Sequence, residues 1–281
     1  MSLWKAERLG EKVSIEFSDD IQIDKLLGSL FADFQLSKSK QIEGVLLQVN
    51  KQAKSWMIID TKSNDTREVH ALGDLVYFLS DKIIYHLIDR INTGHCIHAA
   101  CVAKEGRAFI LPANSGSGKS SFTCWLVANG FDYISDELTI FLESGKVTAI
   151  PRPIQIKNHG IDAIKPLLKD HSKILEGRFA NAISAKALGG QSSILDEWQL
   201  SGMIFPQYSK ENSFSYEPMA GASVAMQLMG SHVNARNLDS HGFRFVTKVA
   251  RETPAFRLEY GGFNYLPDEF SATILGAALE S

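Results

Sequence analysis

One stretch, residues 111–120 with the sequence Leu-Pro-Ala-Asn-Ser-Gly-Ser-Gly-Lys-Ser, constrains the fold more than any other part of the chain. Glycines in such a loop let successive backbone N–H groups turn inward around the phosphates of a nucleotide. The lysine then reaches the outer phosphates, and the serine hydroxyl can ligate magnesium. An apolar run, residues 107–111, precedes the loop, and residues 122–129 are typical of a helix. The sequence therefore predicts a strand, a phosphate-binding loop and a helix in that order.

The expected nucleotide site is one contiguous segment. Lys119 and Ser120 occupy the lysine and hydroxyl positions of the motif, whereas Ala113 stands where the motif usually begins with glycine. The alternative interpretation is that these are ordinary residues at the start of a helix. The residues expected to hold the phosphates are Asn114, Ser115, Gly116, Ser117, Gly118, Lys119, Ser120 and Ser121.

Composition limits the classes of partner. The 281 residues are 44% hydrophobic and 22% charged, which is ordinary for a globular protein with one large or two small domains. A formal net charge of −3 provides no basic surface of the kind that binds nucleic acid, so a small molecule or a protein is the expected partner. Because no uninterrupted apolar segment resembles a signal peptide or a membrane span, we expect no membrane association and a cytoplasmic location.

The cysteines and two neighbouring histidines raise the question of a metal site. Cys96, Cys101 and Cys124 show no Cys-x-x-Cys spacing and suit reduced thiols in the cytosol. His95 and His98 lie in the same short segment as the first two cysteines, a crowding that could indicate a metal site. In an extended strand, however, Cys96 and His98 point to one face while His95 and Cys101 point to the other. We therefore expect no structural metal there.

Hydrophobic periodicity divides the chain into an amino-terminal α+β module, residues 1–92, and a phosphate-loop domain, residues 93–281. A long helix is expected to end the module and join it to the domain. The predicted elements of the module are strands over residues 13–17, 44–49 and 54–59, a hairpin turn over 50–53, and helices over 23–34 and 69–91.

In the second unit, an antiparallel pair of strands, residues 96–103 and 107–111, is expected to lead into the loop. Gly130 should end the helix that follows, and the next strand should deliver Asp136 and Glu137 near the loop. Residues 182–193 are rich in small side chains and are predicted to form a surface loop, ordered or mobile. The remaining predictions are strands over 131–135, 138–142, 147–150, 154–157, 201–208 and 255–260, and helices over 222–229, 242–251 and 267–279.

Three segments together resemble the HPr(Ser) kinase/phosphorylase family, and more closely its HPr-kinase-related (kinase A type) branch. They are Ile97-His98-Ala99, the loop Asn114-Ser-Gly-Ser-Gly-Lys-Ser120, and Ile134-Ser-Asp-Glu137. Residues 151–158, 204–208 and 256–260 are also similar to the branch, so the resemblance covers most of the chain. It implies an α/β (α+β) fold with a P-loop HPr-kinase-like core, ATP and Mg²⁺ as cofactors, and transfer of a phosphoryl group to a hydroxyl.

The resemblance also implies roles for individual residues. Lys119 would offset the negative charge on the transferred phosphoryl group, and Ser120 would ligate magnesium together with Asp136 or Glu137. Asp136 would accept the proton of an incoming serine hydroxyl, and His98 would orient or tune that carboxylate. From the residues alone, the acidic pair could instead form a solvated turn, and His98 could be a hydrogen-bonded core histidine.

The sequence also departs from the family. Ala113 replaces the first loop glycine, Glu137 replaces a second aspartate, and Gln155 replaces a glutamate associated with metal binding. The basic carboxy-terminal signature of true HPr kinases has no counterpart. Three hypotheses result: a kinase for an unidentified protein or small-molecule acceptor, a non-catalytic nucleotide-binding module that acts as a ligand-responsive switch, and a reversible phosphorylase. Arg152 and Lys157 either contact a phosphate or carboxylate or are exposed strand charges, and a homo-oligomer is compatible with the family.

Overall fold

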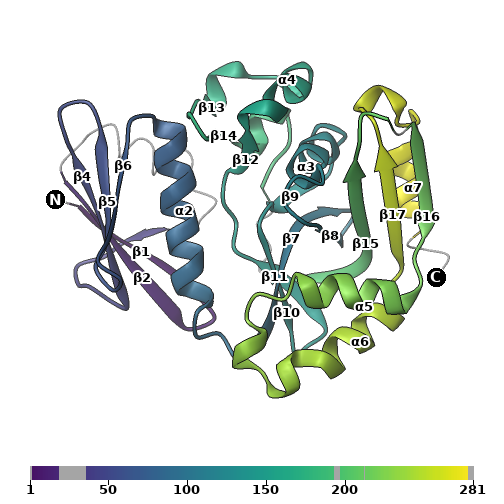
Figure 1. Cartoon of the computed structure of the whole chain (residues 1–281), viewed down its shortest axis with the longest axis horizontal. Coiled ribbons are helices and arrows are strands. Elements are labelled where there is room, and N and C mark those ends of the chain that lie inside the picture. The colour runs from purple at the N-terminus through teal and green to yellow at the C-terminus, as the bar shows by residue number, and fades with distance from the viewer. Residues whose placement is uncertain (1, 19–35, 193–196, 212, 278–281) are drawn as a thin grey trace.

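The computed structural model describes residues 2–18, 36–192, 197–211 and 213–277. Within these residues the fold is mixed α/β, which confirms the predicted class. A six-stranded sheet covered by helix α2 lies beside a larger part that is built around an eight-stranded sheet (Figure 1). None of the described helices combines the length and the apolar character that crossing a membrane requires.

The amino-terminal sheet has the strand order β3-β1-β2-β4-β5-β6, with β2 and β4 parallel and the other neighbours antiparallel. Alternation along β2 places Val13, Ile15 and Phe17 in the core, where the apolar face of α2 covers them. The elements are β1 (Ser2–Arg8), β2 (Glu11–Phe17), β3 (Ser37–Lys38), β4 (Val45–Lys51), β5 (Trp56–Asp60), β6 (Asp65–Val69) and α2 (Leu72–Ile88).

The predictions for this module are confirmed in part. The strands expected over residues 13–17, 44–49 and 54–59 correspond to β2, β4 and β5, and the last two form the expected hairpin. The helix predicted over 69–91 begins only at Leu72, because residues 65–69 instead pair along β5 as β6. Strand β1 was not predicted. The helix predicted over 23–34 lies outside the described residues.

The larger sheet has the order β11-β10-β7-β8-β15-β17-β16, and β9 pairs with β7. The neighbours β8, β15 and β17 are parallel, whereas β7 and β8 are antiparallel as predicted. Its strands are β7 (Gly94–Lys104), β8 (Arg107–Pro112), β9 (Asp132–Ser135), β10 (Leu138–Leu142), β11 (Lys146–Ala149), β15 (Trp198–Tyr208), β16 (Phe214–Pro218) and β17 (Ala255–Tyr260).

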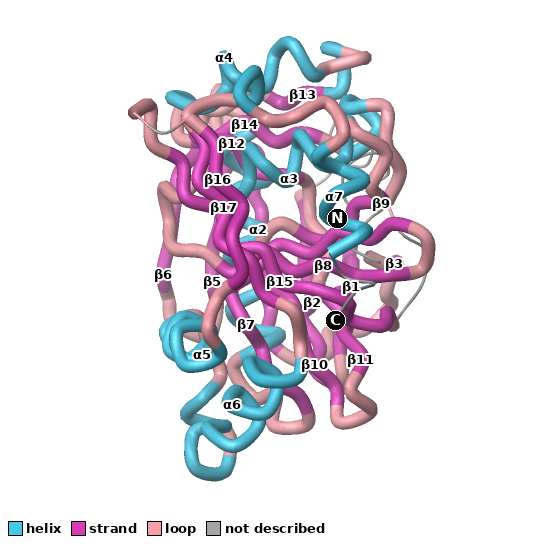
Figure 2. The backbone as a smooth tube through the Cα atoms, turned by 90° about the vertical axis from the view of Figure 1, so that its right-hand side faces the viewer, coloured by secondary structure: helices cyan, strands magenta, loops and turns pink. Residues whose placement is uncertain are grey.

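Two groups of elements pack against this sheet. Helix α3 lies near one end with the three-stranded sheet β12-β14-β13, while α5 and α6 lie together at the other end (Figure 2). Separate hydrophobic clusters accompany the two groups, with Phe122 and Leu126 of α3 in one and Val224 and Val246 of α5 and α6 in the other. These elements are α3 (Lys119–Ala128), β12 (Ile154–Lys157), α4 (Ile161–Ile164), β13 (Ile174–Leu175), β14 (Ala180–Ile183), α5 (Gly221–Gly230), α6 (Phe243–Glu252) and α7 (Phe270–Ala277).

The prediction of a surface loop over residues 182–193 is wrong for the first half of this segment. Residues 182 and 183 belong to β14, and a 3-10 turn with buried Ala187 and Leu188 follows. The small side chains allow close packing, since a Cβ atom on Gly190 would lie 2.4 Å from Val127 of α3. The closing helix begins at Phe270, three residues later than predicted, and β16 was not predicted.

The predicted boundary at residues 92 and 93 falls between α2 and β7, but one core continues across it. Leu138, Ile140 and Ile150 of the second part share a hydrophobic cluster with the apolar side chains of α2. Asp74 at the start of α2 accepts hydrogen bonds from the backbone N–H groups of residues 178 and 179, both at 2.9 Å. Helix α2 is therefore fixed against the second part of the chain.

Candidate nucleotide site

The loop that the sequence predicts to bind phosphate connects the carboxyl end of β8 to the start of α3. β8 lies inside the sheet between β7 and β15, so the loop leaves from a supported position. Gly116 and Gly118 have φ values of +89° and +90°, which favour glycine. No side chain caps the first turn of α3, whose residues Lys119, Ser120 and Ser121 line a cavity. The strand, loop and helix predicted from the sequence are all present, and the N–H groups of that first turn are suited to an anion.

Two tyrosines that line the cavity contact this loop directly. Tyr260 donates from its hydroxyl to the carbonyl of Gly118 at 3.1 Å, and the backbone N–H of Tyr208 donates to the carbonyl of Ser117 at 2.9 Å. A Cβ atom on Gly118 would lie 2.5 Å from the Tyr260 hydroxyl and 2.8 Å from the Tyr208 Cβ. The position consequently requires glycine for space as well as for conformation.

Lys119 points inward from the first turn of α3. Its side chain is buried, its Nζ donates to the main-chain carbonyl oxygen of Asp136, and it lies 4.0 Å from Glu137 Oε2. Burial lowers the pKa of Lys119, and the attraction of the two carboxylates only partly offsets this effect. The motif lysine is thus held against the acidic pair at the end of β9.

Asp136 is fully enclosed by donors. Ser120 Oγ donates to Oδ2 at 3.3 Å, the backbone N–H of Gln155 donates to the same oxygen at 3.0 Å, and Arg152 Nε donates to Oδ1 at 3.0 Å. The side chain is inaccessible and is not among the residues that line the cavity. The structure therefore links Asp136 to the motif serine, and the alternative of a solvated acidic turn is wrong for this residue.

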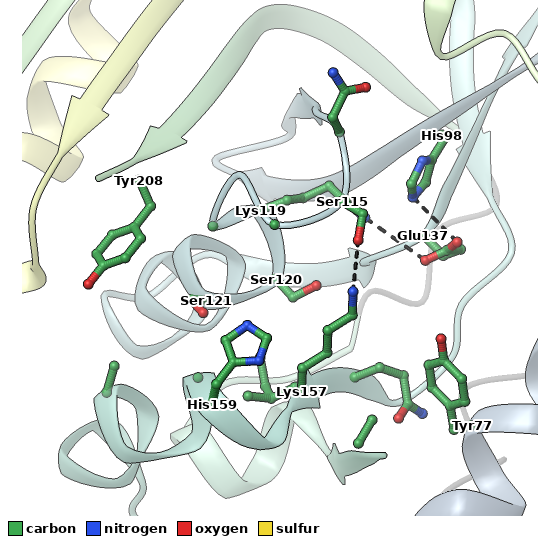
Figure 3. A pocket seen from close by; sticks show the side chains of 18 of the residues that line it. Tyr77, His98, Ser115, Lys119, Ser120, Ser121, Glu137, Lys157, His159 and Tyr208 are labelled. Atoms are coloured by element: carbon green, nitrogen blue, oxygen red, sulfur yellow. Dashed lines mark hydrogen bonds and ion pairs between the residues drawn. The ribbon is translucent and has the colours of Figure 1, made fainter. Parts of the chain in front are cut away.

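Glu137, unlike Asp136, reaches the cavity surface. Its side chain is 25% exposed, and its Oε1 lies 3.4 Å from His98 Nε2 (Figure 3). Its Oε2 pairs with Arg152. Burial alone would raise the pKa of Glu137, but the charge of Arg152, the His98 hydrogen bond and the charge of Lys119 outweigh it and hold the pKa below its ordinary value. His98 also lines the cavity, so the enclosed core histidine considered from sequence is not observed.

Arg152 resolves one alternative left open by the sequence. The side chain is 3% exposed and bridges both carboxylates, and its Nη1 lies 3.8 Å from Asp81 Oδ1 on α2. It is therefore not an exposed strand charge. Because Arg152 also lines the cavity, its contact with a phosphate or carboxylate stays a prediction. The arginine offsets the negative charge of the acidic pair at the cavity wall.

The cavity has a volume of about 310 Å³ and receives side chains from both parts of the chain. Tyr77 of α2 lines it opposite the phosphate loop, and Lys157 extends from the end of β12 to Ser115, Nζ to Oγ at 2.8 Å (Figure 3). Of the predicted site residues, Ser117 and Asp136 lie behind the cavity surface. The others line it: His98, Asn114, Ser115, Gly116, Gly118, Lys119, Ser120, Ser121 and Glu137.

Several lining residues were not predicted. Tyr77 sits in a helix whose apolar stripe indicated core packing alone, and His159 had no supporting constellation in the sequence. Tyr208 and Phe263 lie far from the loop in sequence and approach it only through the parallel strands β15 and β17. No local pattern marks such residues, because their position depends on the tertiary fold.

The donor set suits a hard cation. Ser120 and Asp136 supply adjacent oxygens. Gln155, whose backbone N–H contacts Asp136, carries a buried carboxamide with neither its oxygen nor its nitrogen paired among the described atoms. Magnesium prefers oxygen ligands of this kind. Across the described residues, no group of three or more His, Cys, Asp or Glu side chains is arranged to hold a metal ion, the segment with Cys96 and Cys101 included.

The sequence matches no family model and no curated protein. The function must therefore be inferred from the geometry of this site, and the resemblance to the HPr kinase family remains a hypothesis.

Proposed function

We propose that this chain is an ATP- and magnesium-dependent phosphotransferase of the HPr-kinase-like type, which transfers a phosphoryl group to a hydroxyl of an unidentified protein or small-molecule acceptor. The observation that carries the proposal is the hydrogen bond from Ser120 Oγ to Asp136 Oδ2, at 3.3 Å. It joins the hydroxyl of a phosphate loop to a carboxylate at the end of a neighbouring strand. A phosphate loop with magnesium-binding oxygens of this kind is the common apparatus of nucleoside triphosphate chemistry.

Phosphoryl transfer depends mainly on positioning and on neutralising charge. The backbone N–H groups from Ser115 to Lys119 would hold the phosphates, and the ammonium group of Lys119 would turn from the Asp136 carbonyl toward the outer phosphates. Ser120, Asp136 and the Gln155 oxygen would hold magnesium, which when bound neutralises phosphate charge. These roles use residues that converge in the structure.

The proton of the acceptor hydroxyl needs a base at the cavity surface. Asp136, the base expected from the resemblance, already accepts three hydrogen bonds and does not line the cavity. Glu137 does line it and pairs with His98. We therefore propose that His98, oriented by its contact with Glu137, receives the proton, while Asp136 positions Ser120 and the metal.

The test incubates purified protein with labelled ATP, magnesium and a cell lysate, and then measures label on acceptors. Wild type should transfer phosphate, whereas Lys119→Ala should lose ATP binding and Asp136→Asn should lose transfer. Asp239→Asn, a change at an exposed carboxylate outside the cavity, serves as the control and should behave as wild type. If Lys119→Ala binds ATP as tightly as wild type, the segment is not a phosphate loop.

One observation favours a second function, a nucleotide-binding module that acts as a switch without transfer. Arg152 forms ion pairs with both acidic residues, and Asp136 is buried. Fewer carboxylate groups therefore face the cavity than the sequence suggests. ATP binding by wild type without transfer to any acceptor would support this module. Release of phosphate from a phosphorylated acceptor by wild type would support a reversible phosphorylase instead.

A further inference from the structure

The positively charged side chains around the cavity differ in what they already bind. Lys119 is buried and donates to the Asp136 carbonyl, and Arg152 is buried against two carboxylates. Lys157, by contrast, is exposed, and its ammonium group donates to the neutral hydroxyl of Ser115. A hydroxyl offsets little of a full positive charge, so an anion can displace it from this lysine.

The strand that carries Lys157 fixes it relative to the loop. Ile154 and Ile156 of β12 are buried in the same hydrophobic cluster as α3, and Lys157 stands opposite Ala180 of β14. From this base the side chain crosses the cavity to Ser115, as Figure 3 shows. The ammonium group thus lies at the open side of the phosphate loop, whereas Lys119 approaches from the buried side.

We propose that Lys157 is a second phosphate-binding cation, which leaves Ser115 Oγ and hydrogen-bonds the terminal phosphate of a bound nucleoside triphosphate. This rests on the proposed function, because it requires a nucleotide in the loop. The exchange is favourable because a hydrogen bond between an ammonium group and a phosphate is charged on both sides. Lys157 thereby makes the site prefer a triphosphate to a monophosphate.

The experiment measures binding of ATP, ADP and AMP, each with magnesium, by calorimetry at one ionic strength. Lys157→Met should weaken ATP binding roughly tenfold or more while changing AMP binding less than about twofold, since hydrogen bonds to charged groups have this strength. Lys157→Arg keeps the charge and should retain the preference for ATP. Lys173→Met removes an exposed lysine outside the cavity and controls for net charge.

A further variant separates ligand binding from a purely structural role. Ser115→Ala removes the hydroxyl partner of Lys157 but keeps both the lysine and the backbone N–H of the loop. If Lys157 contacts phosphate, Ser115→Ala keeps the preference for ATP over AMP. If Lys157 only steadies the loop through Ser115, the two variants lose ATP affinity alike, and the proposal is wrong.

The remaining outcomes also test the role of Lys157. If wild type binds ATP and Lys157→Met keeps the wild-type ratio of ATP to AMP affinity, the role of Lys157 is wrong. The proposed function would still stand. Wild type that binds none of the three nucleotides overturns both. Thermal unfolding of each variant checks that the exposed substitution has not altered the fold.

Discussion

Arg152 and Asp136 form a buried ion pair next to Ser120 at the start of α3, with Arg152 Nε 3.0 Å from Asp136 Oδ1. Both side chains are more than nine-tenths buried, and Arg152 also contacts Glu137. Removing one partner of such a pair leaves an uncompensated buried charge. The arginine therefore offsets the negative charge of two adjacent carboxylates.

Replacing Arg152 should destabilise the protein strongly. Arg152→Met is expected to lower the free energy of unfolding by about 3 kcal/mol, because two carboxylates lose their buried partner. Urea denaturation followed by circular dichroism measures the effect. Arg107→Met, at a partly exposed position at the start of β8, is the control and should cost less than about 1 kcal/mol. Equal losses in the two variants would contradict the assigned role of Arg152.

Substituting Gly118 tests the close contact between the loop and the two tyrosines. Gly118→Ala should abolish ATP binding and cost more than about 2 kcal/mol, because a strained φ and a steric clash add together. Gly145→Ala is a matched control with φ of +82° and no atom within 4 Å of the added Cβ. It should cost about 1 kcal/mol and leave ATP binding unchanged. A Gly118 variant that behaves like the Gly145 variant would show that the tyrosines do not limit the loop.

The division of work between the two acidic residues predicts different kinetic defects. Glu137→Gln should reduce the rate of transfer by roughly a hundredfold or more with little change in ATP affinity, because the base His98 loses the carboxylate that orients it. Asp136→Asn should weaken magnesium-dependent ATP binding, since it alters the partner of Ser120. Single-turnover rates and binding constants for both variants distinguish these defects. Full transfer activity in Glu137→Gln would contradict the role of Glu137 and would favour Asp136 as the base.

Acid should destabilise the protein through His95. Burial lowers the pKa of His95 from 6.5 to about 4, and the charge of the nearby His232 contributes to this decrease. The unfolded state then binds more protons between these values, so this contribution to stability is present above pH 6.5 and is lost as the pH falls toward 4. Unfolding free energies at pH 7 and pH 4 should differ by at least about 1 kcal/mol more in wild type than in His95→Asn. An identical pH dependence in both proteins would contradict this assignment.

Local features of the site could be predicted from the sequence, and features that depend on distant contacts could not. The loop with Lys119 and Ser120 is a contiguous motif, and its flanking strand and helix follow from apolar periodicity. Arg152 shows no such signal, because its burial depends on carboxylates delivered by another strand. The enclosure of Asp136 likewise depends on the backbone of β12.

The errors in secondary structure have the same origin. The strand β6 has the polar sequence Asp-Thr-Arg-Glu-Val, with little apolar alternation to detect, and it is defined by its pairing with β5. The small residues near Ala187 indicate a loop by composition, yet they are buried and lie close to α3. In both cases tertiary contacts override local preference.

The hydrophobic cluster that α2 shares with β10 has a practical consequence for anyone who would separate the two parts of the chain. A fragment that starts at residue 93 would expose Leu138 and Ile140 to water and would lose the contact of Asp81 with Arg152. It would also lack Tyr77, one wall of the cavity. The amino-terminal module therefore cannot be treated as an independent attachment, and whatever enters the cavity meets both halves of the protein at once.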